Sequence, residues 1–136
     1  TVSATQTDNA GNTSVAATTT ITLDNSAPTA VTINTPIEVD DIVNASEDDS
    51  VLVTGSGAEA NASLNVNIGG QSQSVTADAS GNWTLSGNEL DISALSNGTL
   101  TVSATQTDSA GNISPAATTA ITLDNTAPTG HAVSVD

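Results

Sequence analysis

The first 30 residues of the chain recur almost unchanged one hundred residues later. Thr1–Ala30 and Thr101–Gly130 align without a gap, and 24 of the 30 positions are identical. The stretch between them, Val31–Leu100, occurs once. A fixed period with two copies of the ends and one of the middle predicts a window from a tandem array, with a repeating unit of about 100 residues. The absence of an initiator Met and of a targeting segment agrees with this interpretation.

The charge balance limits what such a repeat can bind. There are 15 acidic residues and no Lys or Arg, which gives a formal net charge of −15. Most nucleic-acid binding is excluded, because the chain has no Lys or Arg to neutralise phosphate. Uncompensated carboxylates repel one another, so external cations are the simplest way to stabilise a folded form. Ligand sets made only of oxygen select hard ions such as Ca2+.

The apolar residues suit a small β-domain core. Cysteine, Phe, Tyr and Met are absent, and Trp83 is the only aromatic residue. The core is therefore expected from Val, Ile, Leu and Ala around Trp83, with no disulfide. No apolar run approaches the roughly 20 residues needed to span a bilayer, so direct membrane insertion is not expected.

Short alternating segments separated by turn signals predict an all-β fold, an immunoglobulin-like antiparallel β-sandwich of about seven strands, repeated in tandem. In immunoglobulin order the expected strands are A (31–37), B (51–54), C (63–68), D (72–77), E (83–85), F (100–107) and G (117–123). The repeated stretch then corresponds to strands F and G followed by a linker. Pro36 predicts that strand A lies at a sheet edge.

This order divides the chain into three parts. Residues 1–25 are expected to be the F–G hairpin of a preceding repeat, residues 26–125 one complete repeat, and residues 126–136 the start of the next. The hairpin is not expected to fold back onto Val31–Leu85, because the linker Ser26–Val31 spans at most about 20 Å and a sandwich is roughly 25 Å long. Strands A–E of another copy, either a covalent neighbour or a second molecule, are expected to order it.

Three motifs resemble a known family. GNWTLSG at Gly81–Gly87, LSNGTLTVSATQTDSAGN at Leu95–Asn112 and ITLDNTAP at Ile121–Pro128 are similar to the bacterial immunoglobulin-like repeats of giant calcium-dependent RTX-type adhesins. The resemblance covers the whole chain. It implies an extracellular or cell-surface location after type I secretion. It also implies a stalk of many such domains, with calcium at the linkers and in the end loops.

The strand order places almost all carboxylates at the two ends of the sandwich. A calcium ion takes 6–8 oxygens and can draw them from a linker and from both adjacent domains. At the end where the chain comes in, the proximal end, the expected ligands are Asp24, Asn25, Asp78, Asp108 and Asn112. At the opposite, distal end they are Asp40, Asp41, Asp48, Asp49 and Asp124. Solvated surface carboxylates without a metal are the alternative.

Two functions remain open from the sequence. The first is a structural extender that projects adhesive domains at the tip of an adhesin, with neighbouring repeats as its partners. The second is a module that binds a carbohydrate or protein ligand. Near-identity of successive copies favours the extender, and Trp83 is expected in the core rather than on a sugar-binding surface. The Thr-rich segment 18–22 is expected to be ordinary strand rather than an ice-binding face, and His131 to lie on the surface. Catalysis is not expected, because Cys, Lys, Arg and Tyr are absent.

Overall fold

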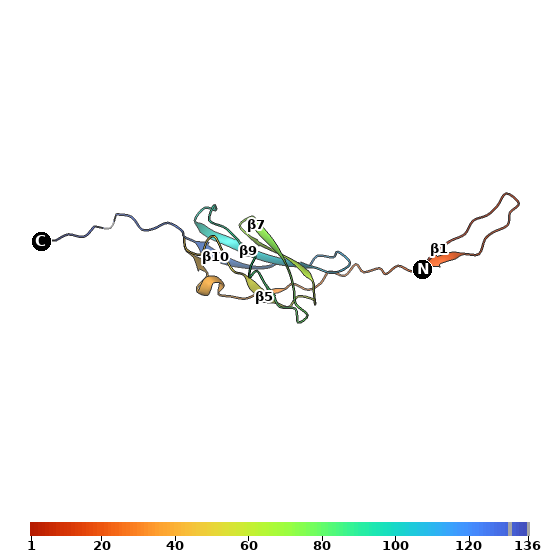
Figure 1. The fold of residues 1–136 in the computed structure, drawn as a ribbon, viewed down its shortest axis with the longest axis horizontal. Helices are drawn as coiled ribbons and strands as arrows, with labels where there is room; N and C mark the ends of the chain where they lie inside the picture. The colour runs from red at the N-terminus through yellow and green to blue at the C-terminus, as the bar shows by residue number, and fades with distance from the viewer. Residues whose placement is uncertain (131, 136) are drawn as a thin grey trace.

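Two packed β-sheets form the body of the molecule in the computed structural model, which describes residues 1–130 and 132–135 (Figure 1). The larger sheet has the strand order β4-β10-β9-β6-β7 and the smaller one β3-β5-β8. The strands of the larger sheet are β4 (Ile42–Val43), β6 (Ser63–Ile68), β7 (Gln71–Thr76), β9 (Gly98–Thr107) and β10 (Ala117–Leu123). Those of the smaller sheet are β3 (Thr32–Ile33), β5 (Thr54–Ser56) and β8 (Trp83–Thr84). The predicted immunoglobulin-like sandwich is confirmed.

Alternation explains which faces of the larger sheet are buried. In β6 the side chains of Leu64, Val66 and Ile68 are buried, whereas Ser63 and Asn65 are exposed. In β9 the inward positions are Val102, Ala104 and Gln106. Successive side chains of a strand point to opposite faces of the sheet, so that one face contacts the core and the other contacts solvent. The two strands pair antiparallel from Ser63 opposite Thr107 to Ile68 opposite Val102.

The predicted strand A, residues 31–37, is shorter than expected, because only β3 within it is a strand. β3 lies at the edge of the smaller sheet, as predicted, and ends before Pro36. Proline has no N–H to donate, so the ladder does not continue. A 3₁₀ turn, η1 (Ile37–Val39), then leads into β4, which pairs in parallel with β10. The sandwich is therefore not wholly antiparallel.

Two other strand assignments need correction. The segment predicted as strand D is β7, and it stays in the sheet of β6, because the tight Gly69-Gly70 turn folds it back beside its neighbour. The predicted strand B begins later, at Thr54, since the backbone of Val51 pairs with Leu90 in an isolated bridge. Residues 87–97, which lie between β8 and β9, form mostly turns and bends.

Trp83 lies in the core, as predicted, with 2% of its surface exposed. It packs over Gly55, where an added Cβ atom would overlap both the indole ring and the carbonyl oxygen of Thr32. Ile92 is fully buried in the core, and the partly buried Leu95 packs against the same cluster. No helix in the described residues is both long and apolar enough to cross a membrane.

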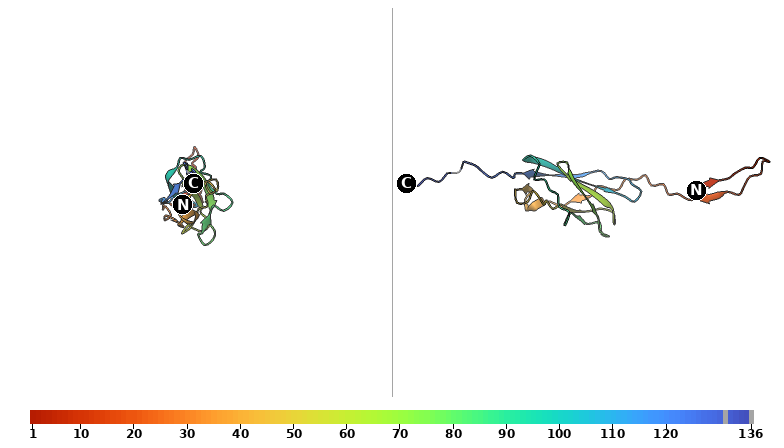
Figure 2. Two further views of the ribbon diagram at one scale, coloured as in Figure 1. Left: turned by 90° about the vertical axis from the view of Figure 1, so that its left-hand side faces the viewer. Right: turned by 45° about the horizontal axis from the view of Figure 1, so that its top comes forward.

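The N-terminal hairpin stands apart from the sandwich. It consists of β1 (Val2–Ala4) and β2 (Ala17–Thr19), and an extended linker separates it from β3 (Figures 1 and 2). The expectation that the hairpin does not fold back onto its own chain is confirmed, because both of its strands are exposed along their whole length. Residues 126–130 leave the sandwich at the opposite end, so the long axis of the molecule runs from linker to linker (Figure 2).

Candidate functional site

Hydrogen bonds tie the N-terminal linker to the loops at the proximal end. The Asn112 side-chain amide donates to the backbone oxygen of Asp24 at 3.1 Å and to Oδ2 of Asp108 at 2.9 Å. Nearby, the Asn61 N–H donates to the backbone oxygen of Asp78. The loops after β5, β7 and β9 therefore lie at the end where the linker arrives, as the strand order predicted.

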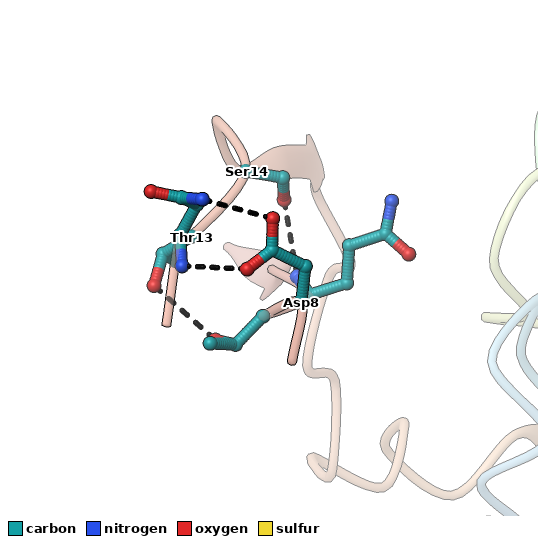
Figure 3. Close-up of a pocket in the computed structure, with 6 residues that line it drawn as sticks. Asp8, Thr13 and Ser14 are labelled. Carbon is teal, nitrogen blue, oxygen red and sulfur yellow. Dashed lines mark hydrogen bonds between the residues drawn. The ribbon is translucent and has the colours of Figure 1, made fainter. Parts of the chain in front are cut away.

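One turn motif, Asp-x-Ala/Ser-Gly-Asn, occurs three times, at residues 8–12, 78–82 and 108–112. In each turn the Asp carboxylate accepts N–H groups two and four residues further on, and in the first and third the Asn side chain also donates to it. Figure 3 shows the first turn, with the Asp8 carboxylate in two of these hydrogen bonds, from the backbone and side-chain nitrogens of Asn12. The side-chain amide of Asn112 is the main cause that holds the pKa of Asp108 below its ordinary value. At Asp78 the N–H of Asn82 is the main cause of the lowered pKa.

Replacing Asp108 by asparagine is expected to lower the free energy of unfolding above about pH 4, because an amide would face the Asn112 amide. A carboxyl with a lowered pKa stabilises the fold above its unfolded pKa, and this stabilisation is lost as pH falls through the folded value. The difference between wild type and variant should therefore shrink below the ordinary value of 3.8. Urea unfolding from pH 7 to pH 2 measures it.

Asp8→Asn is the matched control, because the same turn lies there in the exposed hairpin. It should leave the unfolding of the sandwich unchanged at every pH. A constant difference between wild type and Asp108→Asn down to pH 2 would contradict the assigned role of the carboxylate.

A buried glutamine also holds the proximal linker. Gln106 has no exposed surface, and its Nε2 donates to the backbone oxygen of Thr29 at 2.7 Å. Its Oε1 accepts the N–H of Glu59 at 2.8 Å. The side chain therefore joins the linker to the loop after β5 from inside the sandwich. The sequence pattern that could have indicated this role is Val102-x-Ala104-x-Gln106, in which a polar residue occupies an inward position of an alternating strand.

Gln106→Leu is expected to reduce the free energy of unfolding by about 1–3 kcal/mol, because it leaves the Glu59 N–H and the Thr29 carbonyl without their partner. Faster hydrogen exchange at the Glu59 amide should accompany the loss. Gln6→Leu, the same change in the exposed hairpin, should have almost no effect. Equal losses for the two variants, measured by urea unfolding, would contradict the role of Gln106.

A second set of contacts fixes the linker that leaves the distal end. Asp48 is only 6% exposed, and its Oδ2 accepts the Asn125 side-chain amide at 2.8 Å. Asn97 uses its Oδ1 to accept the Asn125 N–H at 3.2 Å and its Nδ2 to donate to the Thr126 hydroxyl at 2.7 Å. The Asp124 N–H donates to the carbonyl of Val43. Asn97 and Asn125 were not among the expected functional residues, although Asn125 belongs to the repeated LDN motif.

The predicted metal ligands are brought together only in part. Asp24, Asp108 and Asn112 adjoin at the proximal end, and Asp78 lies in a loop at the same end. Asn25 lies in the exposed linker. At the distal end Asp48 and Asp124 flank the outgoing linker. The carboxylates of Asp40, Asp41 and Asp49 accept local hydrogen bonds from Ile42, Ile37 and Ser50, respectively.

The candidate ligands are of the chemical type that calcium binds, but too few of them lie together to complete a site. All candidates are carboxylate or amide oxygens, which hard cations prefer. Among residues 1–130 and 132–135, no three acidic or His side chains form one group that could hold a metal ion. A site at either end would therefore also use backbone carbonyls, water or oxygens of a neighbouring repeat.

Two facing sheets, between which the chain crosses after β3 to reach β4, define an immunoglobulin-like β-sandwich. Residues 32–125 match the family model described as a bacterial Ig-like domain. More than half of the chain is matched, so the chain belongs to the bacterial Ig-like domain family.

Solved structures of adhesins share this fold. One is a Ca2+-stabilized adhesin with which an Antarctic bacterium reaches out and binds ice; identity is 28% over 95% of this chain and 32% of the other, with a TM-score of 0.53. Another is a tetra-tandem repeat in the extending region of a large adhesion protein, with 24% identity over 90% of this chain and 30% of the other and a TM-score of 0.51. A bacterial immunoglobulin-like domain from the M. primoryensis ice-binding adhesin is 28% identical over 73% of this chain and 100% of the other, with a TM-score of 0.48.

The chain spans about a third of the length of the first of these structures. No curated protein sequence matches it significantly. The expected resemblance to adhesin immunoglobulin-like repeats is confirmed, and the family and fold are those of structural modules rather than enzymes.

Proposed function

We propose that this chain is an extender repeat from the stalk of a large secreted or cell-surface adhesin. The observation that carries the proposal is that both linkers are hydrogen-bonded into opposite ends of one sandwich, through Gln106 and Asn112 at one end and Asp48 and Asn97 at the other. Such contacts set the direction in which the chain enters and leaves each repeat, as a stalk requires. The tetra-tandem repeat in the extending region of a large adhesion protein has the same fold.

We further infer that calcium stiffens the joints between repeats. At the proximal joint Asp24, Asn25, Asp78, Asp108 and Asn112 would supply oxygens; at the distal joint Asp40, Asp41, Asp48, Asp49 and Asp124 would do so. A bound divalent cation would offset the repulsion among these carboxylates and connect the linker to the loops. Similarity to a Ca2+-stabilized adhesin supports this choice of ion.

Calorimetric titration of the 136-residue chain with CaCl2 tests this proposal. Saturable binding that weakens in Asp24→Asn and Asp124→Asn is expected, because both carboxylates lie on the linkers. Asp91→Asn is the matched control, since this exposed carboxylate is bonded to Ser93 and is not among the proposed ligands. Equal weakening in all three variants would indicate general charge screening and would contradict defined sites.

A further inference from the structure

The exposed hairpin carries the same face that the complete sandwich buries. In β9 and β10 the side chains of Val102, Ile121 and Leu123 are 0%, 1% and 0% exposed. The residues one hundred positions earlier are identical, yet Val2, Ile21 and Leu23 are 46%, 72% and 84% exposed. An apolar face of this kind, left in water, marks a surface that normally contacts protein.

The differences between the two copies avoid this face. Residues 1–30 and 101–130 differ at six positions, and in the second copy every one of the six is exposed: Ser109, Ile113, Pro115, Ala120, Thr126 and Gly130. Each position that the sandwich buries is unchanged. The hairpin therefore has the same side chains as β9 and β10 at every position that is buried in the sandwich.

The paired part of the hairpin already has the register of the complete sandwich. Val2 pairs with Thr19 and Ala4 with Ala17, in the register of Val102 with Thr119 and Ala104 with Ala117. The Ser14 N–H donates to the Gln6 carbonyl at 2.8 Å, matching 2.9 Å between Ser114 and Gln106. This paired part would need little rearrangement on binding, which lowers the entropic cost, whereas residues 20–23 would have to extend β2.

We propose that this face binds strands β3–β8 of another copy of the repeat, joined through its residue 100 to Thr1. In that sandwich Val2 would lie opposite Ile68 and Gln6 opposite Leu64, following the register of β9 with β6. Leu23 would lie beside Val43, following that of β10 with β4. The inference goes beyond the proposed function, since it requires neither calcium nor adhesion.

The geometry favours a covalently joined copy over the hairpin's own sandwich. Within this chain that surface is already covered by β9 and β10, and the hairpin extends away from it (Figure 1). The sequence that leads into Thr101 is residues 26–100, and the sequence from Thr1 onward repeats that from Thr101. The copy that fits the hairpin is thus one whose residue 100 is joined to Thr1, as residue 100 of this chain is joined to Thr101.

The test is a longer chain in which a second copy of residues 26–100 precedes Thr1, compared with the 136-residue chain in EGTA. In the longer chain, amides of β1 and of residues 19–23 should exchange hydrogen at least about a hundredfold more slowly, because strands in a core open only with large free energies. Unchanged exchange would overturn the proposal. Protection in concentrated 136-residue chain together with a dimer by light scattering would assign the face to a second molecule and overturn it as well.

A matched pair of variants gives a second readout. Leu23→Asp should lower the melting temperature of the added sandwich in the longer chain and leave the 136-residue chain unaffected. Thr18→Asp introduces the same charge at a position whose counterpart, Thr118, is exposed, and should have little effect in either chain. Equal effects of the two variants in the longer chain would contradict burial of the Leu23 face.

Discussion

Leu123→Ala is expected to reduce the free energy of unfolding by about 2–5 kcal/mol, as for other fully buried leucines. Leu123 has no exposed surface and lies beside Val43 at the junction of β10 and β4. Truncation would leave a cavity beside the parallel pair of β4 and β10, which attaches β4 to the larger sheet. Because small domains are stable by only about 5–15 kcal/mol, the variant should be close to unfolding.

Leu23→Ala is the control that the chain itself offers. It makes the same change in the same local sequence, but Leu23 is 84% exposed. Its effect on the unfolding of the 136-residue chain should be within about 0.5 kcal/mol. Similar losses for the two variants, measured by urea denaturation, would show that the hairpin is packed in solution and would contradict its separation from the sandwich.

Calcium is expected to stabilise the chain by about 4 kcal/mol per occupied site at a thousandfold excess over its dissociation constant. The physical reason is the formal charge of −15 with no Lys or Arg, much of it at the two ends of the sandwich. Thermal unfolding in CaCl2 and in EGTA measures the effect. Stability should rise with calcium concentration and return to its starting value on chelation.

Two controls separate bound calcium from screening. NaCl at matched ionic strength weakens repulsion between exposed charges without occupying a site. Magnesium has the same charge but demands a stricter octahedral geometry and loses water reluctantly. If either salt raised the melting temperature as much as calcium, the stabilisation would be general and the proposed sites would be wrong.

The sequence predicted the parts of the fold that depend on local patterns. The segment 63–68 and the segment 117–123 appear as β6 and β10 with the predicted bounds, because strict alternation or a clear turn delimits each. β4 was missed, since Ile42 and Val43 are two apolar residues inside an acidic stretch and form a strand only through β10. The sheet that β7 joins depends likewise on long-range pairing, which periodicity does not encode.

The candidate joints were predictable to a similar degree. Strand order sufficed to place Asp24 with Asp108 and Asn112, because it determines which loops share an end. The contacts that hold the linkers were not predicted. The partners of Gln106 lie 47 and 77 residues away in sequence, and Asn125 reaches Asp48 across 77 residues. Such pairs are set by tertiary packing, whereas the domain boundaries and individual metal ligands remain predictions.

Small-angle X-ray scattering of a chain of three joined repeats tests the central claim, calcium-stiffened extension, most directly. In calcium the maximum dimension should equal the sum of three sandwiches and their linkers in a nearly straight line. In EGTA it should shorten and the scattering should become that of a bending chain, because repulsion among the joint carboxylates is no longer offset. An identical maximum dimension and scattering profile in the two buffers would contradict the claim.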